Sequence, residues 1–163
     1  MLLSRATFLQ RSILGTAATS FAGTISFLPD VAHADVTNKV ASSTALKSLK
    51  RAQRQLTTLL PYVESNDFVQ VKESFRTSPF SDVRKNCFIL IRGGEDGPKV
   101  VELQRTYKNF IANLEKMDST ASLGMRGRSI PEGQLYEEYK AVETTLQEFL
   151  VVAVEAAEIP LQY

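Results

Sequence analysis

The stretch VVELQRTYKNFIANLEKMDSTASLGM, residues 100–125, decides the fold class of this chain. Its apolar side chains recur at alternating spacings of three and four residues, which is the period of one face of an α-helix. These positions are Val100, Leu103, Tyr107, Phe110, Leu114, Met117 and Ala121. Pro98 precedes the stretch and Gly124 follows the last periodic residue, as is typical of the two ends of a helix. We therefore predict a long amphipathic helix between Pro98 and Gly124.

Three further segments show the same helical period. Residues 46–60 form the first, which ends at Leu60 because Pro61 cannot continue a helix. Residues 68–93 form the second and residues 131–156 the last. Four amphipathic segments joined by short connections predict an all-α fold, an up-down-up-down four-helix bundle.

Two places in the second segment need a separate interpretation. At Ser78-Pro79, a Ser N-cap followed by Pro at the first helical position restarts or bends the helix. Residues 87–91, CFILI, form a continuous apolar run that also suits a buried strand. No second strand accompanies it, so we interpret it as the fully buried end of the second helix.

Residues 1–34 differ in kind from the rest of the chain. Arg5 and Arg11 give a positive start, and residues 13–28 are apolar without a charge. The triplet AHA at residues 32–34 places small residues at the −3 and −1 positions of a signal-peptidase site. We predict a cleaved export signal over 1–34, resembling a thylakoid-transfer signal, and the alternative is a membrane anchor that stays.

The remaining domain, residues 35–163, has few groups that carry chemistry. His33 is the only histidine and would be removed, and Cys87 is the only cysteine. A Ser-His-Asp triad, a histidine-liganded metal and a disulfide framework are therefore excluded. Adjacent Glu137 and Glu138 point in different directions along a helix, so they do not form an acid pair. We expect no enzyme activity and no catalytic, cofactor-binding or metal-binding residue.

Charge is balanced overall but segregated along the chain. With 19 Lys and Arg against 18 Asp and Glu, no surplus is left for binding a nucleic-acid backbone. Residues 36–60 carry five basic and no acidic side chains, whereas residues 131–159 carry seven Glu and one Lys. The predicted partner-binding residues are Lys47, Lys50, Arg51, Arg54, Arg126 and Arg128. Alternatively, the basic first helix pairs with the acidic last helix, for instance near Glu143 or Glu148.

The second half of the chain resembles the PsbQ-like extrinsic subunits of photosystem II. Residues 103–125, with FIANLEKMD at 110–118, look like the third helix of that family. Residues 131–142, with LYEEYKAV near their end, look like the start of its fourth helix, and residues 66–70 resemble the aromatic start of its second. The break at Ser78-Pro79 and a Phe where the plant form has Trp favour an algal-type member.

This resemblance implies a structural function rather than catalysis. The chain would be peripheral to the lumenal side of the chloroplast thylakoid membrane and would bind lumenal subunits of photosystem II. There it would dock on the oxygen-evolving complex, help to stabilise it, and help to retain calcium and chloride without holding a cofactor itself. The alternative is an exported periplasmic or secreted helical-bundle module that binds a small ligand or metal.

Overall fold

The computed structural model describes residues 31–94 and 97–158, and the regular elements among them are all helices, with no strand. The elements are α1 (Val31–Thr58), α2 (Leu60–Glu64), α3 (Phe68–Arg76), the 3-10 helix η1 (Phe80–Asp82), α4 (Val83–Gly93), α5 (Val100–Met125) and α6 (Gln134–Glu158). The predicted all-α class is therefore confirmed. Residues 1–30 of the predicted export signal lie outside the described residues, and α1 begins at Val31.

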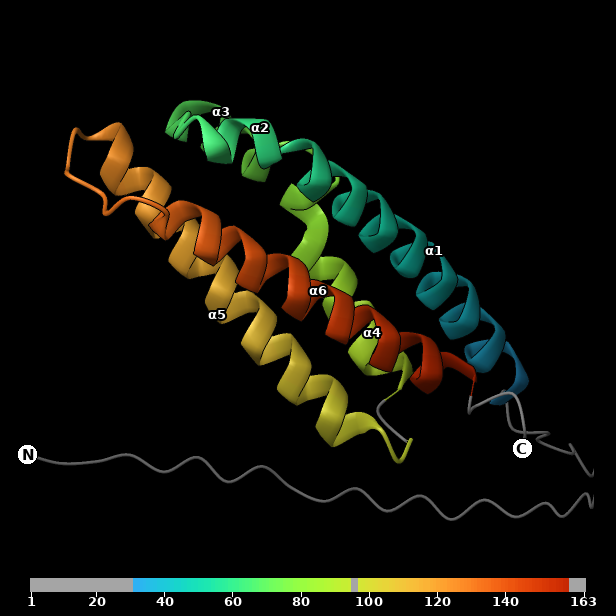
Figure 1. The fold of residues 1–163 in the computed structure, drawn as a ribbon. Coiled ribbons are helices and arrows are strands. Elements are labelled where there is room, and N and C mark those ends of the chain that lie inside the picture. Colours follow the sequence, from blue (N-terminus) through green and yellow to red (C-terminus); the bar gives the residue numbers. More distant parts are fainter. Residues whose placement is uncertain (1–30, 95–96, 159–163) are drawn as a thin grey trace, which may run out of the picture.

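The long helices pack side by side around one core (Figure 1). α5 packs along α6, α1 packs against both α4 and α6, and α3 packs against α5. The helical stripes predicted from the sequence supply the most deeply buried side chains. Among the largest of these are Leu49, Leu56, Leu103, Phe110, Met117, Tyr139, Leu146 and Phe149.

The second predicted segment is a chain of short elements rather than one helix. Its start follows the prediction, because Asp67 caps α3 by accepting a 3.1 Å hydrogen bond from the backbone N–H of Gln70. At the interruption, the Ser78–Pro79 peptide bond is cis, and Pro79 rather than Ser78 stands at the N-cap of η1. The predicted Ser78 cap is therefore wrong. The up-down-up-down arrangement of four helices stays a prediction.

Two further expectations, one about the end of the first helix and one about residues 87–91, are wrong. Pro61 does not end the first helix at Leu60, because α1 ends at Thr58 and Pro61 lies in the first turn of α2. Proline is accepted there because the first N–H groups of a helix have no partner within the helix. The run at residues 87–91 is helical as predicted but is not fully buried, since Phe88 is 53% exposed.

Two leucines on the same stripe of α5 should respond differently to truncation. Leu103 is 0% exposed, whereas Leu114 is 9% exposed and borders an open cleft beside α4. We expect Leu103→Ala to lower the free energy of unfolding by about 3–5 kcal/mol and Leu114→Ala by about 2–3 kcal/mol. The difference arises because water reaches the space next to Leu114, while a closed cavity is left at Leu103. Urea denaturation of both variants measures it, and equal losses would contradict the assigned burial.

Gly124 is required by close packing between α5 and α3. A Cβ atom at this position would lie 2.5 Å from ring carbons of Phe68, well inside van der Waals contact. We expect Gly124→Ala to destabilise the protein even though alanine favours helix by about 1 kcal/mol over glycine. Adding Phe68→Ala should then make Gly124→Ala neutral or stabilising, as thermal unfolding of the four members of the cycle would report. A stabilising Gly124→Ala in the presence of Phe68 would disprove this contact.

Candidate partner-binding surface

The four basic residues predicted on the first helix lie on the outer side of α1. Lys47, Lys50, Arg51 and Arg54 are all exposed and follow one another at helical spacing. Within the described part of the chain, no carboxylate oxygen lies within 4.0 Å of any of them. We call these four residues the α1 strip. Its charge is not neutralised by an ion pair with the rest of the described protein.

The carboxylates of α6 have other neighbours. Glu143 accepts a 2.9 Å hydrogen bond from Lys140 on its own helix, and Glu155 lies 3.0 Å from Lys99. Where α1 faces α6, the hydrogen bond between the helices joins two neutral side chains, Gln53 and Gln147. The two helices are neighbours, as predicted, but the structure does not pair the α1 strip with Glu143 or Glu148.

The α1 strip is divided between two grooves. On one side of α1, Lys47 and Arg51 line a shallow groove of about 350 Å³ together with Lys85 of α4. Asp82 is the acidic member of this groove, and Asn86 donates a 2.9 Å hydrogen bond to Ser48 that links α4 to α1. Lys50 lies on the other side, in a groove towards α6. Half of the strip therefore belongs to a surface shared with α4.

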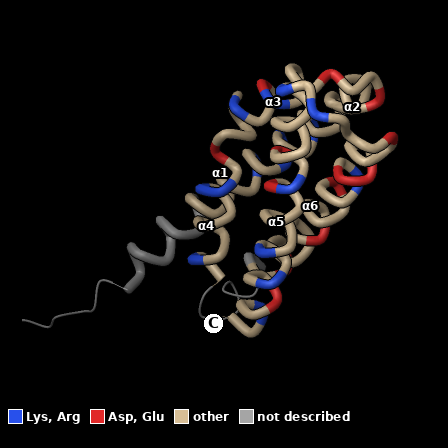
Figure 2. The backbone as a smooth tube through the Cα atoms, turned by 90° about the vertical axis from the view of Figure 1, so that its left-hand side faces the viewer, with Lys and Arg blue, Asp and Glu red and all other residues tan. Residues whose placement is uncertain are grey.

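This sharing makes the α1 and α4 side of the molecule strongly basic. Residues 41–58 and 80–93 together contain seven basic side chains and one acidic side chain, whereas α6 contains six Glu and one Lys. Figure 2 shows basic positions along both α1 and α4. Sequence reasoning missed the contribution of Lys85 and Arg92, whereas the third basic residue of α4, Arg84, pairs with Glu115 of α5. The signal was present, as basic residues without an acid in residues 83–93, but it required knowing that α4 packs on α1.

The two basic residues predicted in the last loop lie apart from the α1 strip. Arg126 and Arg128 are exposed in the connection between α5 and α6, at one end of the molecule in Figure 1. Neither lines the grooves beside α1. Neither has a carboxylate within 4.0 Å in the part of the chain that the structure describes. The predicted partner-binding residues thus fall into two separate groups.

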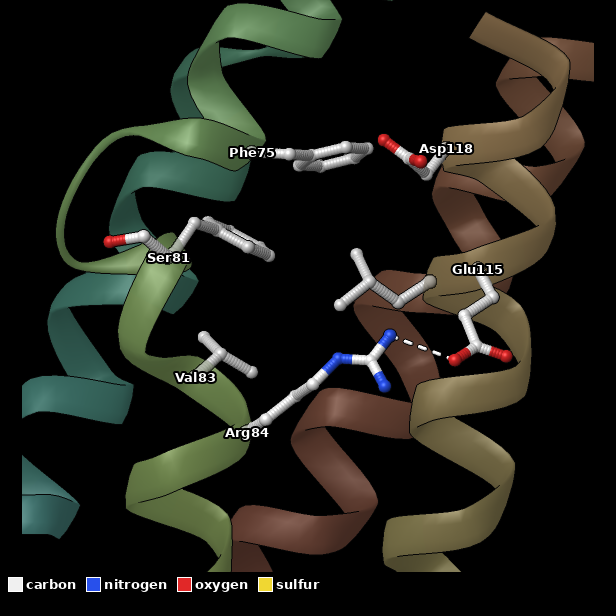
Figure 3. Close-up of a pocket in the computed structure, with 8 residues that line it drawn as sticks. Phe75, Ser81, Val83, Arg84, Glu115 and Asp118 are labelled. Carbon is white, nitrogen blue, oxygen red and sulfur yellow. Dashed lines mark hydrogen bonds and ion pairs between the residues drawn. The ribbon is translucent and has the colours of Figure 1, made fainter. Parts of the chain in front are cut away.

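A cleft of about 170 Å³ opens where α3, η1 and α4 face α5 (Figure 3). Phe75 and Phe80 form one wall, with their ring centres 5.3 Å apart, and Leu114 faces them from α5. The charged groups at its rim already have partners, because Arg84 pairs with Glu115 at 2.8 Å and Asp118 with Lys72. The cleft therefore offers apolar contact but little polar recognition.

The buried titratable groups sit in the core rather than in the grooves. Cys87 is 0% exposed, and burial raises the pKa of its thiol to about 12, so the nucleophilic thiolate is disfavoured. Glu138 is buried while Glu137 is exposed, as expected for adjacent helical residues. Glu138 accepts a 2.9 Å hydrogen bond from Gln134, and its second oxygen has no hydrogen-bond partner. Across the described ranges, His, Cys, Asp and Glu form no group of three able to hold a metal ion.

Two further findings bear on function. No helix in the described part of the chain is both long and apolar enough to cross a membrane. Comparison with protein-family models, curated proteins and solved structures gives no match. The functional argument therefore rests on the residues and on their arrangement.

Burial of Cys87 generates a prediction about its reactivity. Because the pKa is raised to about 12, the thiol should not react with Ellman's reagent at pH 8 in the folded protein and should react fully in guanidinium chloride. The pKa of the folded Cys87 thiol lies above the ordinary value of 9.0. The contribution of the buried neutral thiol to stability is therefore fully present below pH 9 and is lost as the pH rises towards 12. Rapid reaction in the native state at pH 8 would contradict the burial.

Proposed function

We propose that this chain is an extrinsic subunit of photosystem II on the lumenal side of the chloroplast thylakoid membrane. It docks on the oxygen-evolving complex, helps to stabilise it, and helps to retain calcium and chloride. In this proposal the export signal is removed, the protein stays peripheral to the membrane, and its helices form an up-down-up-down four-helix bundle. The resemblance of residues 103–125 and 131–142 to the PsbQ-like family supports this assignment.

The observation that carries the proposal is the unneutralised charge of the α1 strip. An exposed cation without an ion-pair partner contributes little to folding, so its place is not explained by stability. A subunit that attaches reversibly to a larger acidic assembly needs such charges, because complementary charge steers association and fixes orientation. The α1 strip supplies such charges on the surface of the helical body, away from its core.

The proposed role in ion retention needs no metal ligand from this chain. A rigid body bound over the lumenal surface lengthens the path by which calcium or chloride exchanges with the lumen. The packing of α5 and α6 around Phe110, Leu146 and Phe149 supports such a rigid body. In this account the ions are held by the partner, and the chain acts by covering it.

The alternative function is an exported helical module that binds a small ligand, and it rests on the cleft beside α5. Phe75, Phe80 and Leu114 supply an apolar lining for such a ligand. However, the ion pairs at the rim satisfy the polar groups that would orient it, and the cleft is open to solvent. The docking proposal uses cations that have no ion-pair partner in the described structure, whereas the charged groups around the cleft already have partners.

Charge reversal on the α1 strip tests the proposal. We expect the double variant Lys50→Glu, Arg54→Glu to rebind to salt-washed photosystem II membranes at least about tenfold more weakly than the original protein. Its free energy of unfolding should change by about 0.5 kcal/mol or less per substitution, because neither residue forms an ion pair in the described structure. A sedimentation assay measures rebinding, and thermal unfolding measures stability.

The matched control reverses two exposed charges on another helix. Arg105 and Lys108 lie on the outer side of α5, and we expect Arg105→Glu, Lys108→Glu to leave rebinding within about twofold of the original protein. The double variant Arg126→Glu, Arg128→Glu tests separately whether the connection between α5 and α6 takes part in rebinding. Failure of the original protein to rebind would refute the proposed function. Normal rebinding of the Lys50, Arg54 variant with a lowered melting temperature would favour pairing within the chain instead.

A further inference from the structure

The outward side of α4 combines basic side chains with an exposed aromatic ring. Lys85, Phe88 and Arg92 follow one another at spacings of three and four residues, so they share one face of the helix. All three are exposed, and Phe88 keeps 53% of its surface open to solvent. The fold therefore leaves much of the apolar surface of this ring unused.

Phe88 is nevertheless held in a defined position. Its ring centre lies 5.2 Å from that of Tyr107 on α5, at an interplanar angle of 53°. Tyr107 in turn lies 6.3 Å from Phe149, which is fully buried in the core. Such tilted aromatic pairs restrict ring orientation, and an ordered side chain loses less entropy when a partner covers it. Phe88 is therefore a positioned apolar contact on the surface.

The unpaired cations on this side of the molecule come from two helices. Lys47 and Arg51 of α1 line the groove with Lys85, and the hydrogen bond from Asn86 to Ser48 fixes the two helices at this point. In the described residues, no carboxylate lies within 4.0 Å of these three cations. The groove thus presents a net positive charge, and Lys85 at its edge lies one helical turn before Phe88 on the same face of α4.

We infer that α4 forms the centre of a docking face for an acidic protein surface that carries an exposed apolar side chain. This α4 face consists of Lys47, Arg51, Lys85, Phe88 and Arg92. Carboxylates of the partner face Lys47, Arg51 and Lys85, and its apolar side chain packs on Phe88 beside Tyr107. The inference rests on the proposed function, since it assigns that docking to the α1 and α4 side of the molecule.

Two features favour a protein over an anionic membrane as the occupant. The cations line a recess between two helices, which accepts a projecting carboxylate side chain better than it meets a flat layer of headgroups. Phe, Tyr and Arg are also the residue types enriched at the centres of protein interfaces. The combination of Phe88 and Tyr107 with Arg92 and Arg51 fits that composition.

Single substitutions with matched controls test the α4 face. We expect Lys85→Glu and Phe88→Ala each to weaken rebinding to salt-washed photosystem II membranes by about tenfold. The controls Lys108→Glu and Val101→Ala alter an exposed cation and an exposed apolar residue on α5, and they should stay within about twofold. Circular dichroism and thermal unfolding verify that each variant is folded. If both α4 variants rebind like the original protein, the inference is wrong while the proposed function stands.

A second probe separates failure of the inference from failure of the proposed function. Titration of the isotope-labelled protein with a synthetic peptide rich in Glu and Leu should shift the amide signals of Lys47, Lys85 and Phe88 first, and Phe88→Ala should reduce the affinity. If the protein binds this peptide at the α4 face but never rebinds to photosystem II, only the proposed function is refuted. Absence of shifts at these residues overturns the inference. If Lys85→Glu and Phe88→Ala weaken binding to phosphatidylglycerol vesicles as strongly as they weaken rebinding to photosystem II membranes, the occupant is a membrane and the inference is overturned.

Discussion

Burial of one face of α6 is the constraint on which the other elements depend. Tyr139, Leu146 and Phe149 are at most 1% exposed, and α6 contacts α5, α1, α4 and α2. Each such side chain contributes about 1.5–3 kcal/mol when it leaves water, so the neighbours must close around this face. Apart from the buried Glu138, glutamates of α6 then take outward positions, as Glu148 and Glu155 do. The acidic side of the molecule is therefore a consequence of how α6 is buried.

The sequence predicts the long helices well because their apolar period is unbroken. In α5 the alternation of three and four residues continues from Leu103 to Ala121, and every turn supports the same assignment. The short elements are harder, since a helix of one or two turns depends on tertiary packing more than on its own residues. Pro61 shows the ambiguity: proline stops a helix interior yet suits a first turn, and only the bend between α1 and α2 decides. Phe88 shows another limit, because five consecutive apolar residues in a helix cannot all face one core.

The candidate surface was likewise predictable where it depends on the residues of one helix, and not where it depends on how two helices pack. The α1 strip was predictable because its four cations lie within eight residues of one helix and no acidic residue interrupts them. Lys85 was not predictable as part of the same surface, since its position depends on the packing of α4 against α1. The alternative of pairing with α6 did not allow for neutral contacts, because the hydrogen bond between the two helices joins Gln53 and Gln147. Charge patterns thus identify which helices are polar, but not which side chains face each other.

The separation of core and surface explains how one chain can be stable and also attach reversibly. Exposed ion pairs contribute about 0–1 kcal/mol, so the fold tolerates cations such as Lys47 and Arg51 without partners. Their attraction to an acidic partner is screened strongly at 1 M salt, where the Debye length is about 3 Å. Contact with Phe88 is apolar and is not screened, so it resists the salt that releases the charges. A surface built from both therefore combines rapid, salt-sensitive attraction with a local contact that sets which part of the partner is recognised.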